Sequence, residues 1–259
     1  MLLQNMRRFV LQKTVTKILT TAFFVVAAVL PHVCYAQQMD ARISRDSWRI
    51  ITKVEYREGI PKGLLHSMSL VETGMAQQGQ VLPWPYTANV NTTAATAYKT
   101  RGEALSAIDD LRRLGFDKFT ITADNLSRKY VSTNAAERFL NGIEADVFTV
   151  QGLSFSKRFQ DKDNAVAFVK VLLDKGYTNV DVGLMQVNWK YHGENFTNLE
   201  DAFDPYKNVD YAVSYLRKHR QTRDWWGSVG RYHSGTRNHA EKYVKTVWAM
   251  YQKVHKLKI

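Results

Sequence analysis

The sequence is almost without cysteine, since Cys34 is the only one among 259 residues. One cysteine cannot close an intramolecular disulfide, so packing alone must hold the fold. The seven histidines do not supply a metal site either, because His233 and His239 lack acidic partners at ligand spacing. We therefore expect neither a metal nor any other cofactor.

Blocks of basic residues with interleaved aromatic residues, which are typical of nucleic-acid binding, are also missing. The chain is nevertheless basic, with a formal net charge of +12. Such a charge suits an anionic surface or polymer, for example a cell-wall glycan that carries peptide carboxylates, or phospholipid headgroups. We expect no nucleic-acid partner, and the charge alone does not decide between the other classes.

One apolar run stands out, "ILTTAFFVVAAVL" (residues 18–30), which follows a basic segment and precedes Cys34-Tyr35-Ala36. This order is typical of a secretory signal peptide, so we expect residues 1–36 to be removed after Ala36 and the protein to be exported. The mature chain would carry a charge of +8, because the signal segment holds four basic residues and no acid. An uncleaved anchor is the alternative, since the run is only slightly short of a bilayer span.

The remaining chain, residues 37–259, predicts an α+β fold that is mainly α. Helical periodicity dominates both ends, whereas the middle, at about 85–180, looks like an inserted and duplicated region. There "EALSAIDDLRRLGFDKFTI" aligns with "NAVAFVKVLLDKGYTNVDV", which places Gly115 on Gly176. Each copy predicts a helix that ends at a glycine and is flanked by β-rich segments. We expect two small β-α-β units.

A glutamate lies on the apolar side of the helix predicted by "LLHSMSLVETG" (residues 64–74). Leu65, Met68 and Val71 form the apolar stripe, and Glu72 follows Met68 by four residues on the same face. Burial disfavours the charged form and raises the pKa of a carboxyl, as a general acid at neutral pH requires. The alternative is a buried glutamate that pairs with an arginine or caps a neighbouring helix.

Four segments in this order resemble the lytic transglycosylases, the soluble lytic transglycosylase and goose-type lysozyme-like family. The segment with Glu72 resembles the family's catalytic-glutamate helix, and "DVGLMQVNW" (residues 181–189) resembles its Gly-Leu-Met-Gln motif. "DPYKNVDYAVSYL" (204–216) and "RYHSGTRNHAEKYVKTV" (231–247) resemble its last two motifs. The sequence departs from the family at Thr73, which replaces a serine, and around Tyr232, where Arg231 and His233 replace alanine and asparagine.

The resemblance implies a lysozyme-like helical domain that cuts the β-1,4 bond between N-acetylmuramic acid and N-acetylglucosamine in peptidoglycan. Glu72 would act as acid and then as base, and the product would be a 1,6-anhydro sugar. Six residues of the matching motifs would contribute to substrate binding: Thr73, Gly183, Met185, Gln186, Asn188 and Tyr232. Gln186 would hydrogen-bond in the groove, Tyr232 would hold Glu72 or a sugar, and Gly183 would let the backbone approach the glycan.

Each of these residues also has a structural alternative. Gln186 could be a strand residue whose amide bonds to the backbone. Tyr232 could be a core aromatic residue, and Gly183 could be required by a turn. Trp84 and Tyr86, in "LPWPYTANVN", would either stack on sugar rings or cover the core. Asp181 is a candidate second acid: at about 6.5 to 9.5 Å from Glu72 it would position a water and make the enzyme an inverting hydrolase.

We expect a periplasmic enzyme whose partners are peptidoglycan strands and whose membrane contact is made only through the signal peptide. Enzymes of this kind often serve conjugation, secretion, pilus or flagellar machines, and the duplicated insertion would be a docking or restraining element. The alternatives are a peptidoglycan hydrolase (lysozyme or muramidase) and a non-catalytic scaffold that binds glycan.

Overall fold

The computed structural model describes residues 41–77, 80–130 and 132–256. The predicted signal peptide lies outside these residues. The chain divides into two compact units, Met1–Arg45 and Asp46–Ile259. In the first unit the described residues, 41–45, are helical. A search of the described residues finds no helix with the length and hydropathy needed to span a bilayer.

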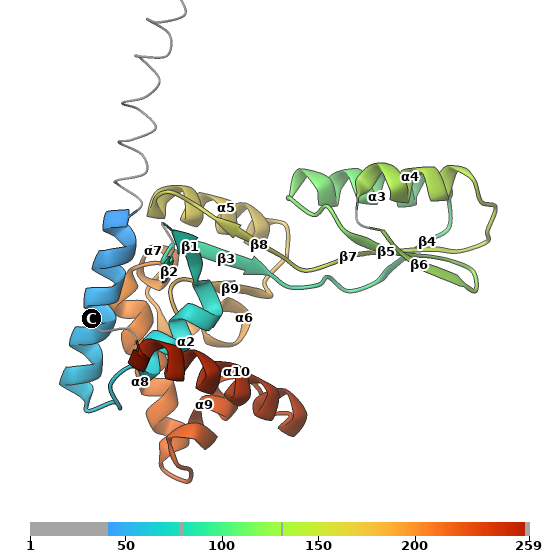
Figure 1. Ribbon diagram of the computed structural model, residues 1–259. Helices are drawn as coiled ribbons and strands as arrows, with labels where there is room; N and C mark the ends of the chain where they lie inside the picture. The colour runs from blue at the N-terminus through green and yellow to red at the C-terminus, as the bar shows by residue number, and fades with distance from the viewer. Residues whose placement is uncertain (1–40, 78–79, 131, 257–259) are drawn as a thin grey trace, which may run out of the picture. The chain divides into compact units, whose positions relative to one another are not determined.

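The second unit has the predicted α+β, mainly helical composition, which confirms the fold class. Its central helix is α2 (Leu64–Thr73), which packs against α10 (Arg237–Lys256). Further helices are α8 (Pro205–Arg220), α9 (Trp225–His233) and the short α6 (Trp189–His192), η1 (Gly193–Asn195) and α7 (Leu199–Ala202) (Figure 1). Leu65 and Met68 of α2 are fully buried in this helical core together with Val209, Val229 and Val247.

The start of α2 is held by a buried carboxylate on the preceding helix, which covers residues 46–58 of this unit. Glu55 is 4% exposed and accepts the backbone N–H groups of Gly63 at 2.8 Å and Leu65 at 2.7 Å. His66 Nδ1 lies 3.2 Å from the same carboxylate. The first N–H groups of a helix have no partner within it, so Glu55 satisfies them and fixes where α2 begins.

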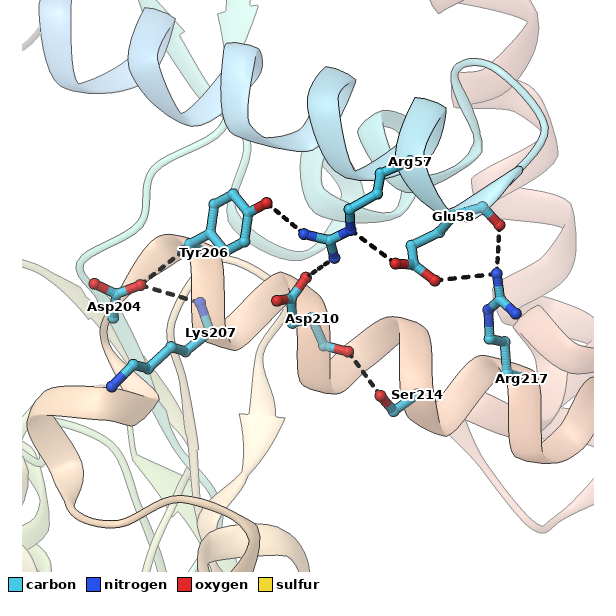
Figure 2. A network of polar contacts seen from close by, with 8 residues as sticks. All are labelled: Arg57, Glu58, Asp204, Tyr206, Lys207, Asp210, Ser214 and Arg217. Carbon is cyan, nitrogen blue, oxygen red and sulfur yellow. Dashed lines mark hydrogen bonds and ion pairs between the residues drawn. The ribbon is translucent and has the colours of Figure 1, made fainter.

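An exposed polar network ties the helix over residues 46–58 to α8, as Figure 2 shows. Arg57 donates to Asp210 at 2.5 Å, to Glu58 at 2.8 Å and to the hydroxyl of Tyr206. Arg217 in turn contacts the Glu58 carboxylate at 3.0 Å. Isolated surface ion pairs contribute little to stability, but one guanidinium shared by three partners fixes the spacing of two helices.

Two four-stranded sheets divide the middle of the chain. The first has the order β10-β9-β3-β8 and uses β3 (Thr87–Val90), β8 (Phe155–Arg158), β9 (Val180–Val182) and β10 (Val187–Asn188). The second has the order β4-β7-β5-β6 and uses β4 (Thr96–Tyr98), β5 (Phe119–Ala123), β6 (Leu126–Tyr130) and β7 (Phe148–Gly152). A separate hairpin pairs β1 (Met75–Gln77) with β2 (Gln80–Leu82).

All strands of the second sheet come from residues 96–152, together with α3 (Arg101–Arg113) and α4 (Thr133–Asn141). We call residues 91–154 the nested module, because they are inserted between the paired strands β3 and β8. Figure 1 shows α3 and α4 on one face of the module's sheet. Its buried residues, such as Ile108, Phe119 and Leu140, belong to the same apolar cluster as Val169 and Leu172 outside it.

The nested module repeats the architecture of the segment that follows it. Helix α5 (Lys162–Asp174) begins and ends 61 residues after α3. Both helices end alike: Phe116 N–H donates to Leu111 O at 3.0 Å, and Tyr177 N–H donates to Leu172 O at 2.9 Å. The predicted pair of β-α-β units is therefore present, one in each sheet.

The strand registers of the two sheets are also equivalent. Ala88 of β3 pairs with Lys157 and Val182. Val150 of β7 pairs with Thr96 and Ile121, which precede Lys157 and Val182 by 61 residues. Each middle strand therefore pairs antiparallel with both strands of one β-α-β unit.

The turn between β9 and β10 requires glycine because of its backbone conformation and its contact with a buried side chain. Gly183 has φ 79°, and a Cβ there would lie 2.4 Å from Asn208 Nδ2. The buried Asn208 donates to Val182 O at 3.1 Å and Ala202 O at 2.8 Å, and accepts from Met185 N–H at 2.7 Å. The open side of Gly183 faces Asn208, so the turn by itself accounts for this glycine. The predicted function of Gly183 in glycan approach stays a prediction.

We predict that Gly183→Ala destabilises the protein by about 3 kcal/mol or more, from the left-handed backbone and the displaced Asn208 bonds together. Gly59→Ala is the matched control, because Gly59 has φ 59° and no atom lies within 4 Å of the position that a Cβ would take. It should cost about 1 kcal/mol. Urea unfolding measures both, and equal costs would contradict this account of the turn.

Candidate active site

A polar groove of about 780 Å³ runs along the C-terminal end of α2 and the edge of the first sheet. We call it the Glu72 groove. Its walls come from α2, β3, β8, β9, β10, α6, α8 and α9. Amides, tyrosine rings and two carboxylates line it: Asn89, Asn91, Asn179, Gln186, Asn188, Tyr191, Tyr211, Tyr215, Tyr232, Glu72 and Asp181. Amides and aromatic faces suit the hydroxyls, acetamido groups and apolar faces of sugars.

Glu72 lies in the last turn of α2, with its side chain half-buried and facing the groove. The hydroxyl of Tyr243, on α10, donates to Glu72 Oε1 at 2.5 Å. Burial raises the pKa of Glu72 to about 7, and the charge of Asp181 adds to this effect. The Tyr243 bond acts in the opposite direction because it stabilises the carboxylate. Glu72 can therefore both give and take a proton near neutral pH.

Tyr243 is itself held in place by a neighbouring ring. It is 6% exposed, and its ring stacks on that of His233 with centroids 4.3 Å apart and planes 4° apart. Burial raises the pKa of the Tyr243 phenol, and the charge of Glu72 raises it further. Tyr243 thus stays a hydrogen-bond donor at neutral pH. The sequence analysis did not identify this contact with Glu72.

Asp181 lies in the groove within a set of asparagine amides. Its Oδ2 accepts from Asn89 at 3.0 Å and from Asn91 at 2.9 Å, and its Oδ1 accepts from Asn188 at 2.6 Å. Asn188 also donates to Asn179 Oδ1 at 2.8 Å. Both carboxylate oxygens are engaged, so Asp181 is a fixed negative charge in the groove wall.

Gln186, Asn188 and Tyr232 line the groove as predicted for binding residues, but their bonds are internal. Gln186 has φ 48°, and its amide donates to Gly183 O at 2.8 Å and Thr87 O at 3.1 Å. The hydroxyl of Tyr232 donates to Met185 O at 2.7 Å. The hydroxyl that bonds to Glu72 is that of Tyr243. Tyr232 was expected to hold Glu72 or a sugar, and contact with a sugar stays a prediction.

Four other candidates lie outside the lining of the groove. Thr73 is buried and donates to Ser69 O at 3.0 Å, and the Met185 side chain is fully buried in the helical core. Trp84 is 3% exposed and its indole N–H donates to Phe159 O at 2.8 Å. Tyr86 packs against the cluster shared with the nested module. All four are held by contacts outside the lining of the groove, and their assignment to substrate binding stays a prediction.

Several groove residues were not predicted from the sequence. Tyr211 and Tyr215 project from successive turns of α8 with their rings nearly parallel, 10° apart, and the Tyr211 hydroxyl lies 2.8 Å from His192 Nδ1. Their spacing of four residues, beside the apolar stripe of α8, is the signal that could have identified them. No sequence pattern identifies Asn91 and Asn179 as groove residues, because they are brought together by the geometry of loops.

Among the described residues, no group of three or more His, Cys, Asp or Glu side chains is arranged to hold a metal ion.

Comparison with known families gives the class of the protein. Residues 155–254 match the model of the family described as "Transglycosylase SLT domain". This segment is therefore similar to the SLT domain of the lytic transglycosylases, enzymes that cleave the glycan strands of peptidoglycan. The matched segment includes β8, α5, β9, β10 and all later helices, but neither α2 with Glu72 nor the nested module. No curated protein and no solved structure matches the chain.

Proposed function

We propose that this enzyme is exported and cuts the β-1,4 bond between N-acetylmuramic acid and N-acetylglucosamine with Glu72 as its catalytic residue. The observation that carries the proposal is a carboxyl whose pKa is raised to about 7 inside a groove lined by amides and tyrosines. A glycosidase acid needs this combination of partial protonation and access to a sugar.

The reaction begins when protonated Glu72 gives its proton to the glycosidic oxygen. The bond between that oxygen and the muramoyl C1 breaks, and N-acetylglucosamine leaves with a free 4-hydroxyl. The carbonyl oxygen of the substrate's own N-acetyl group bonds to C1 and disperses its positive charge. The Glu72 carboxylate then removes the proton of the C6 hydroxyl, and O6 attacks C1 as the bond between C1 and the N-acetyl oxygen breaks. A 1,6-anhydro sugar leaves, and Glu72 is protonated again.

Asp181 supports transglycosylation over hydrolysis in this proposal. An inverting hydrolase needs a second carboxylate free to hold and deprotonate a water. Three amide N–H groups already engage the oxygens of Asp181. Its fixed charge instead raises the pKa of Glu72 and stabilises the cationic sugar.

The basic segment and apolar run of residues 1–36 support export, and peptidoglycan as substrate supports a periplasmic location. We further propose that cleavage is local, for an envelope-spanning machine such as a conjugation, secretion or pilus system. The nested module supports this idea as an addition within the hairpin of β3 and β8, where a partner could bind it.

We predict that Glu72→Gln lowers the release of anhydro-muropeptides from purified sacculi at least 100-fold, because glutamine cannot transfer a proton. Mass analysis of the fragments measures this release. Glu200→Gln, an exposed residue of α7 away from the groove, is the control and should keep full activity.

A product one water heavier than the anhydro form would show a hydrolase in place of a transglycosylase. Sacculus binding that is indifferent to Glu72, with no fragments from either variant, would show a non-catalytic glycan-binding scaffold. Undiminished anhydro release by Glu72→Gln would contradict the assignment of Glu72.

Two substitutions around Glu72 should move the pH profile in opposite directions. Tyr243→Phe removes a bond that lowers the pKa of Glu72, so the alkaline limb of kcat/KM should shift to higher pH. Asp181→Asn removes a negative charge that raises this pKa, so the same limb should shift to lower pH. Shifts in the same direction, or a limb that neither change moves, would contradict the electrostatic account of the site.

A further inference from the structure

A second cavity, of about 710 Å³, lies between the nested module and the loop over residues 176–179. We call it the module cavity. It shares two wall residues with the Glu72 groove, Asn91 and Asn179. The two residues form a ridge fixed by hydrogen bonds: Asn91 N–H donates to Asn179 O at 3.1 Å, and the Asn91 amide donates to Asp181 at 2.9 Å. The two spaces are therefore neighbours on either side of one ridge.

The second copy of the β-α-β unit shows which side chains can fill the space that is open in the module cavity. In the second copy three rings fill the corresponding space: Phe159 and Phe168 have centroids 5.1 Å apart, and Phe155 and Phe168 have centroids 6.4 Å apart. Lys157 lies over two of them, with Nζ 4.6 Å from the Phe168 centroid.

The residues 61 positions earlier are smaller or more polar. Ala94, Tyr98 and Ala107 stand at the positions of the three phenylalanines, and Thr96 stands at that of Lys157. All four line the module cavity. The first copy thus leaves open a space that the same fold fills with aromatic side chains in the second.

The chemistry of the module cavity suits sugars. Hydroxyls and amides surround it, including those of Thr92, Ser106, Tyr177 and Asn179. The carboxylate of Glu103 is engaged with the backbone N–H groups of Lys99 and Thr100, both at 3.1 Å. A volume of about 710 Å³ falls within the range of ligand sites.

We propose that the module cavity is a second saccharide-binding site, into which a β-1,4 glycan strand bound in the Glu72 groove continues across the Asn91–Asn179 ridge. This inference rests on the proposed binding of glycan by that groove. The nested module then makes the enzyme select long strands over short ones, because only a long strand reaches both sites.

The test measures the binding of peptide-free β-1,4 N-acetylglucosamine oligomers to the Glu72→Gln protein, so that cleavage cannot interfere. Affinity should rise once an oligomer is long enough to cross the ridge. Ala107→Phe, which copies the residue of the second repeat, should fill the cavity and weaken binding of the long oligomer about tenfold, with no change for a trimer.

Ala97→Phe is the matched control, since Ala97 is an exposed residue of β4 that does not line the cavity, and it should leave both affinities unchanged. Ser106→Tyr, at an exposed lining position of α3, provides a second obstruction in case Ala107→Phe does not fold.

Equal affinities for long and short oligomers, or equal losses for both in the two obstructing variants, would overturn the inference. A length effect seen only with peptide-bearing strands would also overturn it and assign the cavity to the stem peptide. Failure of the Glu72→Gln sacculus experiment would refute the proposed cleavage but leave length-dependent binding intact, so the two failures are distinguishable.

Discussion

The site depends on the contact between the end of α2 and α10, where the Tyr243 hydroxyl meets the half-buried carboxyl of Glu72. Desolvation raises the pKa of Glu72 to about 7, and the bond from Tyr243 limits this rise and sets the direction of the carboxyl. Other contacts position the two partners: Glu55 fixes the start of α2, and His233 stacks on Tyr243. A carboxyl poised near neutral pH follows from packing on both sides of α2.

The first sheet connects this site to the nested module. Its strand β9 carries Asp181, whose charge acts on Glu72, and its strand β3 leads through Asn91 into the module. The module repeats the β-α-β unit beside it with the same register, but leaves a cavity where the second copy packs phenylalanines. Two copies of one structural element, of which only one carries the large side chains that fill its space, thus provide room for the additional binding site that we propose.

Periodicity and glycine positions predicted the fold class, the buried face of α2 and the two β-α-β units, because these depend on local pattern. Membership of the same sequence motif did not predict which side chains face the groove. Gly183, Met185 and Gln186 are near neighbours in the chain, yet the turn directs Gly183 and Met185 to the interior and only Gln186 to the groove. Tyr243 was missed because it is separated from Glu72 by 171 residues in the sequence, and local sequence patterns do not predict contacts over such separations.

The most direct test of the central claim is a titration of the Glu72 carboxyl by ¹³C NMR, assigned with Glu72→Gln. The account predicts a midpoint near pH 7, because burial and the charge of Asp181 outweigh the bond from Tyr243. A midpoint near the ordinary value of 4.5 would show that solvent reaches the carboxyl freely, and would contradict its function as the acid of this enzyme.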